Sequence, residues 1–138
     1  MSYLVDLAKN VYKENNSSDI YDILINALLK IEDNLNPKII TNIVEIKYLT
    51  YLGVGLNLDG CSVCGLTSVV SMSYNKGGYV CINHVGKDKV MDDVTLKLFK
   101  AYYYIDISKI SELNIKEKVV NEIDHFLNIY YKEYTGLY

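Results

Sequence analysis

Four residues of this chain have the types and spacing of metal ligands. One pair, Cys61 and Cys64, has C-x2-C spacing, and a second pair, Cys81 and His84, has C-x2-H spacing, with sixteen residues between the pairs. Zn²⁺ prefers four thiolate or imidazole ligands in a tetrahedron, and the two pairs supply them. Gly65, directly after the first pair, permits a positive φ angle that lets backbone N–H groups point at the sulfurs. The spacing predicts one structural zinc ion per chain.

Three other interpretations of the cysteines fit the sequence less well. A redox-active Cys61/Cys64 pair would lie beside a βαβ unit, and no such unit is predicted. Buried core thiols would have apolar neighbours, whereas Ser, Asn and Gly residues surround these positions. A catalytic zinc would keep an open coordination position and a nearby general base, but four protein ligands fill the shell. The odd number of cysteines also argues against a disulfide framework.

The elements that position these ligands are mainly helical. Apolar residues recur with helical spacing over residues 3–14, 19–33, 37–52, 91–104 and 115–134. The broad apolar stripe of the third segment predicts a central, buried helix, capped by Asn36 with Pro37 at its first position. In the last segment, Asn114 and Glu117 are placed to form a capping box.

A different pattern interrupts the helices between residues 57 and 89. Val69–Tyr74 and Tyr79–Val80 have strand-like composition, and the turn-forming residues 75–78 between them predict a β-hairpin. We therefore predict a mainly α fold: a helical bundle formed by one domain, 1–138, with a small zinc-bound β-hairpin inserted at about 57–89. The hairpin would bring the two ligand pairs together.

The charge of the chain limits how it could contact nucleic acid. The net charge is −3 and all fourteen basic residues are lysines, so the bidentate fork of arginine is missing. A salt-sensitive lysine patch on the insertion is the remaining candidate: Lys76, Lys87 and Lys89, with Tyr74 and Tyr79 as stacking faces. Acidic residues at 59, 88, 92 and 93 oppose this role, and a solvated hairpin tip is the alternative.

No group of residues indicates catalysis. The sequence shows no Ser/His/Asp or Cys/His nucleophile set and no phosphate-binding glycine loop, so we predict no enzyme activity. His125 is expected to be a structural or exposed helix residue. No apolar run reaches the roughly 18 residues needed to span a bilayer, and the first residues lack signal-peptide features. We expect a cytosolic protein with no membrane contact.

The segment from Tyr48 to Gly65 resembles the bacterial recombination mediator RecO. In that family a central helix ends at leucine and glycine, and a short apolar linker leads into C-x2-C-G. Residues 77–81 resemble the family's glycine-containing hairpin, and the last helix, with Tyr130-Tyr131 and then Gly136, resembles its closing helix. The similarity covers essentially the whole chain. His84 stands where many members have cysteine, and no strand-rich OB-fold precedes the first helix, so the chain corresponds to the C-terminal portion of that family.

This resemblance implies a non-enzymatic DNA repair protein of the RecF pathway. Such a protein binds single- and double-stranded DNA, RecR and the acidic C-terminal tail of single-stranded DNA-binding protein (SSB). It anneals strands and helps to load RecA, in the cytoplasm at the nucleoid. DNA binding by this portion alone is expected to be weak, because the OB-fold carries much of the family's DNA surface.

The SSB tail is acidic and ends in apolar residues, so its groove needs a lysine beside an apolar pocket. Lys97 and Lys100 are the candidates for this contact. A zinc-ribbon module that binds other proteins in transcription or ribosome biology is the alternative function.

Overall fold

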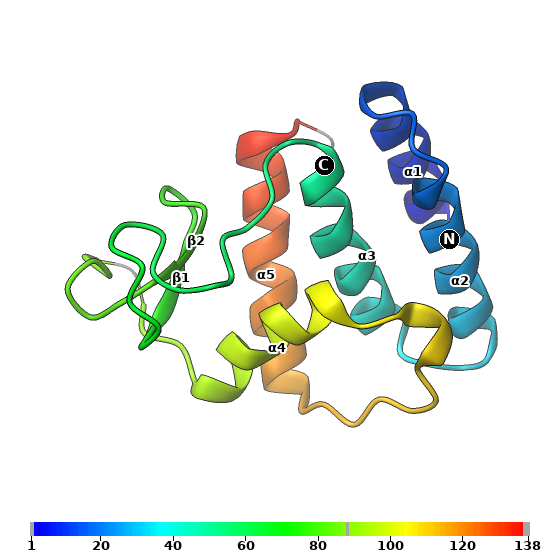
Figure 1. Ribbon diagram of the computed structural model, residues 1–138. Coiled ribbons are helices and arrows are strands. Elements are labelled where there is room, and N and C mark those ends of the chain that lie inside the picture. Colours follow the sequence, from blue (N-terminus) through cyan, green and yellow to red (C-terminus); the bar gives the residue numbers. More distant parts are fainter. Residues whose placement is uncertain (1, 88, 137–138) are drawn as a thin grey trace.

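The computed structural model describes residues 2–87 and 89–136. Its helices are α1 (Ser2–Glu14), α2 (Asp19–Glu32), α3 (Pro37–Tyr51), α4 (Asp93–Tyr104) and α5 (Glu117–Tyr134), with a short 3-10 helix, η1 (Ile107–Lys109). Strands β1 (Ser71–Ser73) and β2 (Gly78–Val80) form a two-stranded antiparallel hairpin between α3 and α4 (Figure 1). The predicted fold class, a mainly helical protein with a small β-hairpin, is confirmed.

Helix α3 is the centre of the helical body. The Asn36 side chain accepts hydrogen bonds from the backbone N–H groups of Lys38 (2.9 Å) and Ile39 (3.4 Å), so the predicted cap is confirmed. The helix packs against α1, α2, α4 and α5, which is why it is buried on nearly all sides. Figure 1 shows α3 standing between α5 and α2, with the hairpin on the far side of α5.

Two predicted helix starts differ from the structure. Helix α4 begins at Asp93 rather than Met91, because the Met91 backbone N–H donates to the Val70 carbonyl (2.9 Å) beside the hairpin. Helix α5 begins at Glu117 after the extended residue Lys116, which makes no side-chain cap, so the capping box predicted at Asn114 is wrong. The chain stays extended there because side chains 113 and 115 pack against the main core.

The hairpin is shorter than its sequence pattern predicted. The paired residues run from Ser71 opposite Val80 to Ser73 opposite Gly78. Tyr74 leaves the ladder because its ring stacks on Phe126 of α5, with ring centroids 4.6 Å apart. The first strand therefore ends at Ser73, and the residue after it packs on the helical body instead of extending the hairpin.

A close backbone contact fastens the hairpin to the segment after α3. The Asn57 N–H donates to the Gly77 carbonyl (2.9 Å), and the Tyr79 N–H donates to the Asn57 carbonyl (3.0 Å). A Cβ atom at Gly78 would overlap the Asn57 backbone, lying 2.7 Å from its nitrogen. Only glycine fits at this position, which explains the second glycine of the Gly77-Gly78 turn.

Most buried apolar side chains form one cluster, to which all five of these helices contribute. A second, small cluster lies in the insertion and consists of Cys61, Val80, Cys81 and Val85. Among the described residues, no helix is long and apolar enough to cross a membrane.

Candidate metal centre

The structure brings the four predicted ligands into one cluster. The sulfur atoms of the three cysteines and a ring nitrogen of His84 all lie within 4.8 Å of one another. The Cys81 sulfur lies 3.2 Å from His84 Nδ1 and 3.6 Å from the Cys64 sulfur, while the Cys61 sulfur lies 3.7 Å from His84 Nδ1. Cys61 and Cys81 are buried, His84 is half-buried and Cys64 is exposed.

Backbone hydrogen bonds form each half of the cluster. In the first half, the Gly65 N–H donates to the Cys61 carbonyl (2.8 Å) and the Cys61 N–H to the Leu66 carbonyl (2.7 Å). Gly65 has a φ of 81°, as its place after the C-x2-C pair predicted. In the second half, the His84 N–H donates to the Cys81 carbonyl (3.0 Å). Two tight turns, here called the first and second knuckles, thus point their ligand atoms at one centre.

The first knuckle is also bound to the second strand. The Ser62 N–H donates to the Tyr79 carbonyl at 2.7 Å. Strand β2 leads directly into Cys81, so this bond fixes the spacing between the two knuckles. The hairpin therefore positions the ligand pairs as the sequence pattern indicated.

The electrostatics of the cluster favour a bound cation. Burial opposes ionisation of Cys61, but hydrogen bonds from the backbone N–H groups of Cys64, Cys81 and Val63 lower its pKa to about 5. The Leu66 N–H favours a thiolate at Cys64, yet desolvation and the neighbouring sulfurs raise the pKa of Cys64 overall. One thiolate thus forms readily while a second is disfavoured by charge. A central cation removes that repulsion.

The spacing of the ligand atoms fits tetrahedral zinc. Zn–S bonds of about 2.3 Å and Zn–N bonds of about 2.0–2.1 Å give S–S edges near 3.8 Å and S–N edges near 3.6 Å in a tetrahedron. Three of the distances between ligand atoms, 3.2–3.7 Å, lie close to these edges. They exceed the S–S bond of about 2.0 Å in a disulfide, and all three cysteines are free. Three sulfurs and one nitrogen would fill the shell of one zinc ion, as in a structural site.

The candidate lysines of the insertion do not form one patch. The Lys76 Nζ donates to the His84 carbonyl (2.7 Å), so its ammonium lies beside the second knuckle, and Lys87 is exposed just beyond it. Lys89 lines a separate cavity of about 510 Å³ that also contains Lys118 and the exposed His125. The two tyrosines are not free stacking faces, because Tyr79 is buried and Tyr74 stacks on Phe126. The prediction that Tyr74 and Tyr79 are stacking faces is therefore wrong.

Lys97 and Lys100 line a groove between α4 and the insertion. The groove has a volume of about 570 Å³, and its apolar walls include Leu58, Val69 and Leu96. Lys97 forms an exposed ion pair with Asp93 (2.8 Å), whereas Lys100 forms no ion pair among the described residues. The structure therefore places both lysines beside an apolar surface.

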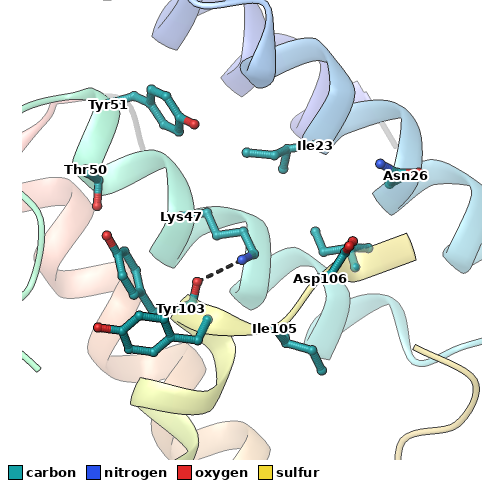
Figure 2. Close-up of a pocket in the computed structure, with 10 residues that line it drawn as sticks. Ile23, Asn26, Lys47, Thr50, Tyr51, Tyr103, Ile105 and Asp106 are labelled. Carbon is teal, nitrogen blue, oxygen red and sulfur yellow. Dashed lines mark hydrogen bonds between the residues drawn. The ribbon is translucent and has the colours of Figure 1, made fainter. Parts of the chain in front are cut away.

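A third lysine-containing cavity was not foreseen from the sequence. It has a volume of about 520 Å³ and lies between α2, α3 and the end of α4. Figure 2 shows the Lys47 side chain reaching across α3 to the Tyr103 carbonyl, to which its Nζ donates at 2.8 Å. Burial lowers the pKa of Lys47, although Asp106 in the same cavity raises it. The helical periodicity gave no signal for this contact, since it joins residues far apart in the chain.

A buried carboxyl group on α3 was also missed. Glu45 is 1% exposed and accepts hydrogen bonds from the Tyr3 hydroxyl (2.7 Å) and the Asn42 amide (3.0 Å). The same amide donates to Asp124 of α5 at 2.9 Å. Burial raises the pKa of Glu45 to about 7, although the two hydrogen bonds lower it. This polar group joins α1, α3 and α5 inside the bundle.

Comparison with known proteins places the chain among DNA repair proteins. A family model described as "Recombination protein O C terminal" matches residues 1–138. A DNA repair protein RecO from Bacillus cytotoxicus is 28% identical over 99% of this chain and 57% of the relative. DNA repair protein RecO from Exiguobacterium sibiricum is 29% identical over 98% of this chain and 56% of the relative. The chain thus spans a little over half the length of these relatives, and no solved structure matches it.

Proposed function

Because this chain belongs to the recombination protein O C-terminal family, we propose that it is the helical, metal-binding portion of a non-enzymatic mediator of DNA repair and recombination in the RecF pathway. The observation that carries the proposal is the family match along the whole chain, joined to the four converging metal ligands. In this role the chain works in the cytoplasm, at the nucleoid. Its activity is to hold other molecules together and not to transform them.

The metal supplies structure in this proposal. Cys61, Cys64, Cys81 and His84 hold one Zn²⁺, which cross-links the two knuckles and neutralises the clustered thiolates. Four protein ligands leave no position for a substrate or an activated water. The ion therefore fixes the shape of the insertion, and the partners bind to the surfaces around it.

DNA is the first proposed partner, in single- and double-stranded form. Lys76 and Lys87 beside the second knuckle, and Lys89 nearer α5, supply the positive charge for phosphate contacts. Three lysines without any arginine make few phosphate contacts, and the net charge of −3 repels DNA elsewhere. DNA binding by this chain is thus weak and strongly salt-dependent, and strand annealing is not expected from it alone.

The acidic tail of SSB is the second proposed partner, in the groove with Lys97 and Lys100. Its apolar walls suit the hydrophobic end of the tail, and the free ammonium of Lys100 suits its carboxylates. The cavity around Lys47 suits the tail less well. Lys47 is half-buried and its ammonium donates to the Tyr103 carbonyl, whereas Lys100 is exposed (Figure 2).

A binding experiment with a synthetic SSB tail peptide tests this assignment. The zinc-loaded chain should bind the labelled peptide, and Lys100→Glu should weaken binding at least tenfold through charge reversal. Lys9→Glu, an exposed substitution on α1, is the control of equal charge and should leave binding nearly unchanged. Equal losses of peptide affinity in Lys100→Glu and Lys9→Glu would place the tail outside this groove. So would a loss of affinity in Lys47→Met together with unchanged binding in Lys100→Glu.

RecR is the third proposed partner, and RecA loading is the outcome that the assembly serves. The family match supports this part of the proposal, but no particular surface of the chain carries it. Co-purification of RecR with the chain tests it directly. Capture of ribosomal or transcription proteins in place of RecR and SSB would instead support the alternative of a zinc-ribbon interaction module.

A further inference from the structure

The two knuckles expose an unusual amount of apolar side chain. Ile82 is 67% exposed, Val63 is 52% exposed and Leu66 is 50% exposed. Single exposed apolar residues are common on protein surfaces and need no explanation. These three, however, lie within two residues of the metal ligands Cys64 and Cys81, whose sulfurs are 3.6 Å apart. These three exposed residues flank candidate ligands on both knuckles, and they are here called the knuckle face: Val63, Leu66 and Ile82.

The knuckle face is held rigidly. Two hydrogen bonds fix the backbone of the first knuckle. The Cys61 N–H donates to the Leu66 carbonyl (2.7 Å), and the Ser62 N–H donates to the Tyr79 carbonyl (2.7 Å). A bound metal ion would restrain the second knuckle further. Because the backbone that carries these side chains is already ordered, binding of a ligand to them costs little conformational entropy.

Positive charge borders the knuckle face on one side. The Lys76 ammonium lies 2.7 Å from the His84 carbonyl, and His84 is two residues after Ile82. Lys87 follows in the exposed turn after the second knuckle. Neither lysine forms an ion pair among the described residues, so both charges are available to an anionic partner.

We propose that the knuckle face contacts the unpaired bases of a single DNA strand, while Lys76 and Lys87 contact its phosphates. The proposal rests on the DNA role above and names the form of DNA that this site prefers. An apolar surface beside cations matches a single strand, whose bases expose apolar faces and whose backbone is anionic. In a duplex the base faces are stacked inside, so the same surface would meet only phosphates. The tyrosines of the insertion are packed inward and leave this contact to the aliphatic residues.

Three labelled DNA ligands separate base contacts from phosphate contacts. They are a thymine oligonucleotide of about 20 nucleotides, longer than a typical site, an abasic strand of equal length, and a duplex of equal length. Fluorescence anisotropy with the full zinc-loaded chain should give tightest binding for the thymine strand. The abasic strand and the duplex should bind more weakly and about equally well.

Substitutions on the knuckle face should weaken the contacts with bases and leave the contacts with phosphates unchanged. The double variant Val63→Ser/Ile82→Ser should weaken binding of the thymine strand about fivefold to tenfold, within the range for loss of one base contact. Its binding to the abasic strand and its salt dependence should not change. Ile25→Ser/Leu29→Ser is the matched control, because those α2 residues are 55% and 52% exposed and lie outside the insertion. Zinc content of one per chain in each variant shows that the knuckles are intact.

The lysines should give the opposite pattern. Lys76→Ala should reduce the slope of log affinity against log salt concentration by about 0.7, the value for one phosphate contact on a single strand. Equal affinity for the thymine and abasic strands, or equal losses in the knuckle and α2 variants, would overturn the proposal. Loss of SSB tail binding in the knuckle variant, with DNA binding intact, would make the face a peptide site. Absence of all DNA binding by the unmodified chain would instead overturn the DNA role itself.

Discussion

The helical body and the metal-binding insertion are stabilised in different ways. The body buries apolar side chains from α1, α2, α3, α4 and α5 in one continuous cluster. The insertion contributes Leu58, Met72 and Tyr79 to that cluster, but its two knuckles have only a separate cluster of four buried residues, of which Cys61 and Cys81 are candidate ligands. Four buried residues cannot offset the entropy of ordering residues 60–66 and 81–87 at about 1–2 kcal/mol each. The comparison teaches that one chain can combine a fold held by its core with a segment whose fold we expect a metal cross-link to hold.

Metal removal should show this difference most strongly. Chelation should disorder the knuckles and leave the helices folded, because structural zinc contributes about 10–16 kcal/mol of apparent binding free energy in small zinc domains. Amide NMR spectra should lose dispersion for the knuckles, residues 60–66 and 81–87, and keep it for α3 and α5. Elemental analysis should give one zinc per chain before chelation. Protein purified without chelator that contains no zinc, or unchanged knuckle resonances after chelation, would contradict the comparison.

Loss of a large core ring should affect the body instead. Phe126 is 1% exposed and contacts the rings of Tyr74, Phe99 and Tyr130. Phe126→Ala should lower the free energy of unfolding by about 3–5 kcal/mol, measured by urea titration of the helical signal. Ile25→Ala, at a 55% exposed position, should change it by no more than about 0.5 kcal/mol. A similar loss in both variants would mean that α5 is not packed as described.

The buried carboxyl of Glu45 should make the body sensitive to pH. Its pKa is about 7 in the folded chain against 4.5 when exposed, so the folded state binds the extra proton between these values. Its contribution to stability is therefore complete below pH 4.5 and is lost as the pH rises through 7. The loss is at most about 3–4 kcal/mol, at about 1.4 kcal/mol per pKa unit.

Comparison with Glu45→Gln isolates this effect from other titrating groups. The difference in unfolding free energy between the two proteins should vary between pH 4.5 and 8, and the variant should be relatively more stable at the alkaline end. A carbon NMR titration of the Glu45 carboxyl should report the same pKa. A difference that does not vary with pH would show that the group is ionised throughout.

Two glycines separate stability from metal affinity. Gly78→Ala forces a Cβ against Asn57 and toward the Ser62 hydroxyl, so it should cost about 1–3 kcal/mol and also weaken zinc binding by displacing the first knuckle. Gly53→Ala, after α3, meets no atom within 4 Å but has a φ of 79°. It should cost about 1 kcal/mol and leave zinc affinity unchanged. Competition with a chromogenic chelator measures the affinity, and equal effects of the two variants would show that Asn57 does not position the site.

The sequence predicted the insertion better than the polar interior of the body. The four ligands, the hairpin between them and the cap of α3 follow from short-range spacing, so local patterns were sufficient. The start of α5 could not be predicted this way, because burial of Leu113 and Ile115 against the core outweighed the capping preference of Asn114. Occupation of the site by zinc, and the DNA and peptide contacts of the lysines, stay predictions.

The polar groups of α3 show why the polar interior of the helical body could not be predicted. The broad apolar stripe predicted that α3 is buried, but it did not indicate what Glu45 and Lys47 contact. Their partners, Tyr3 and Tyr103, are 42 and 56 positions away in the chain. Helical periodicity describes one element at a time and cannot identify such partners.

The phenol groups around the insertion have a consequence for how fast the chain acquires metal. The hydroxyl of Tyr79 donates to the Leu96 carbonyl, that of Tyr134 to the Tyr74 carbonyl (2.6 Å) and that of Tyr130 to the Val54 carbonyl (2.9 Å). None of these bonds involves a ligand, so they hold the ends of the insertion to the helices before metal arrives. The ligands then search within a short loop and not along a free chain, which lowers the entropy of closing the site. We therefore expect capture of the ion to be a late step, completed on a scaffold that is already in place.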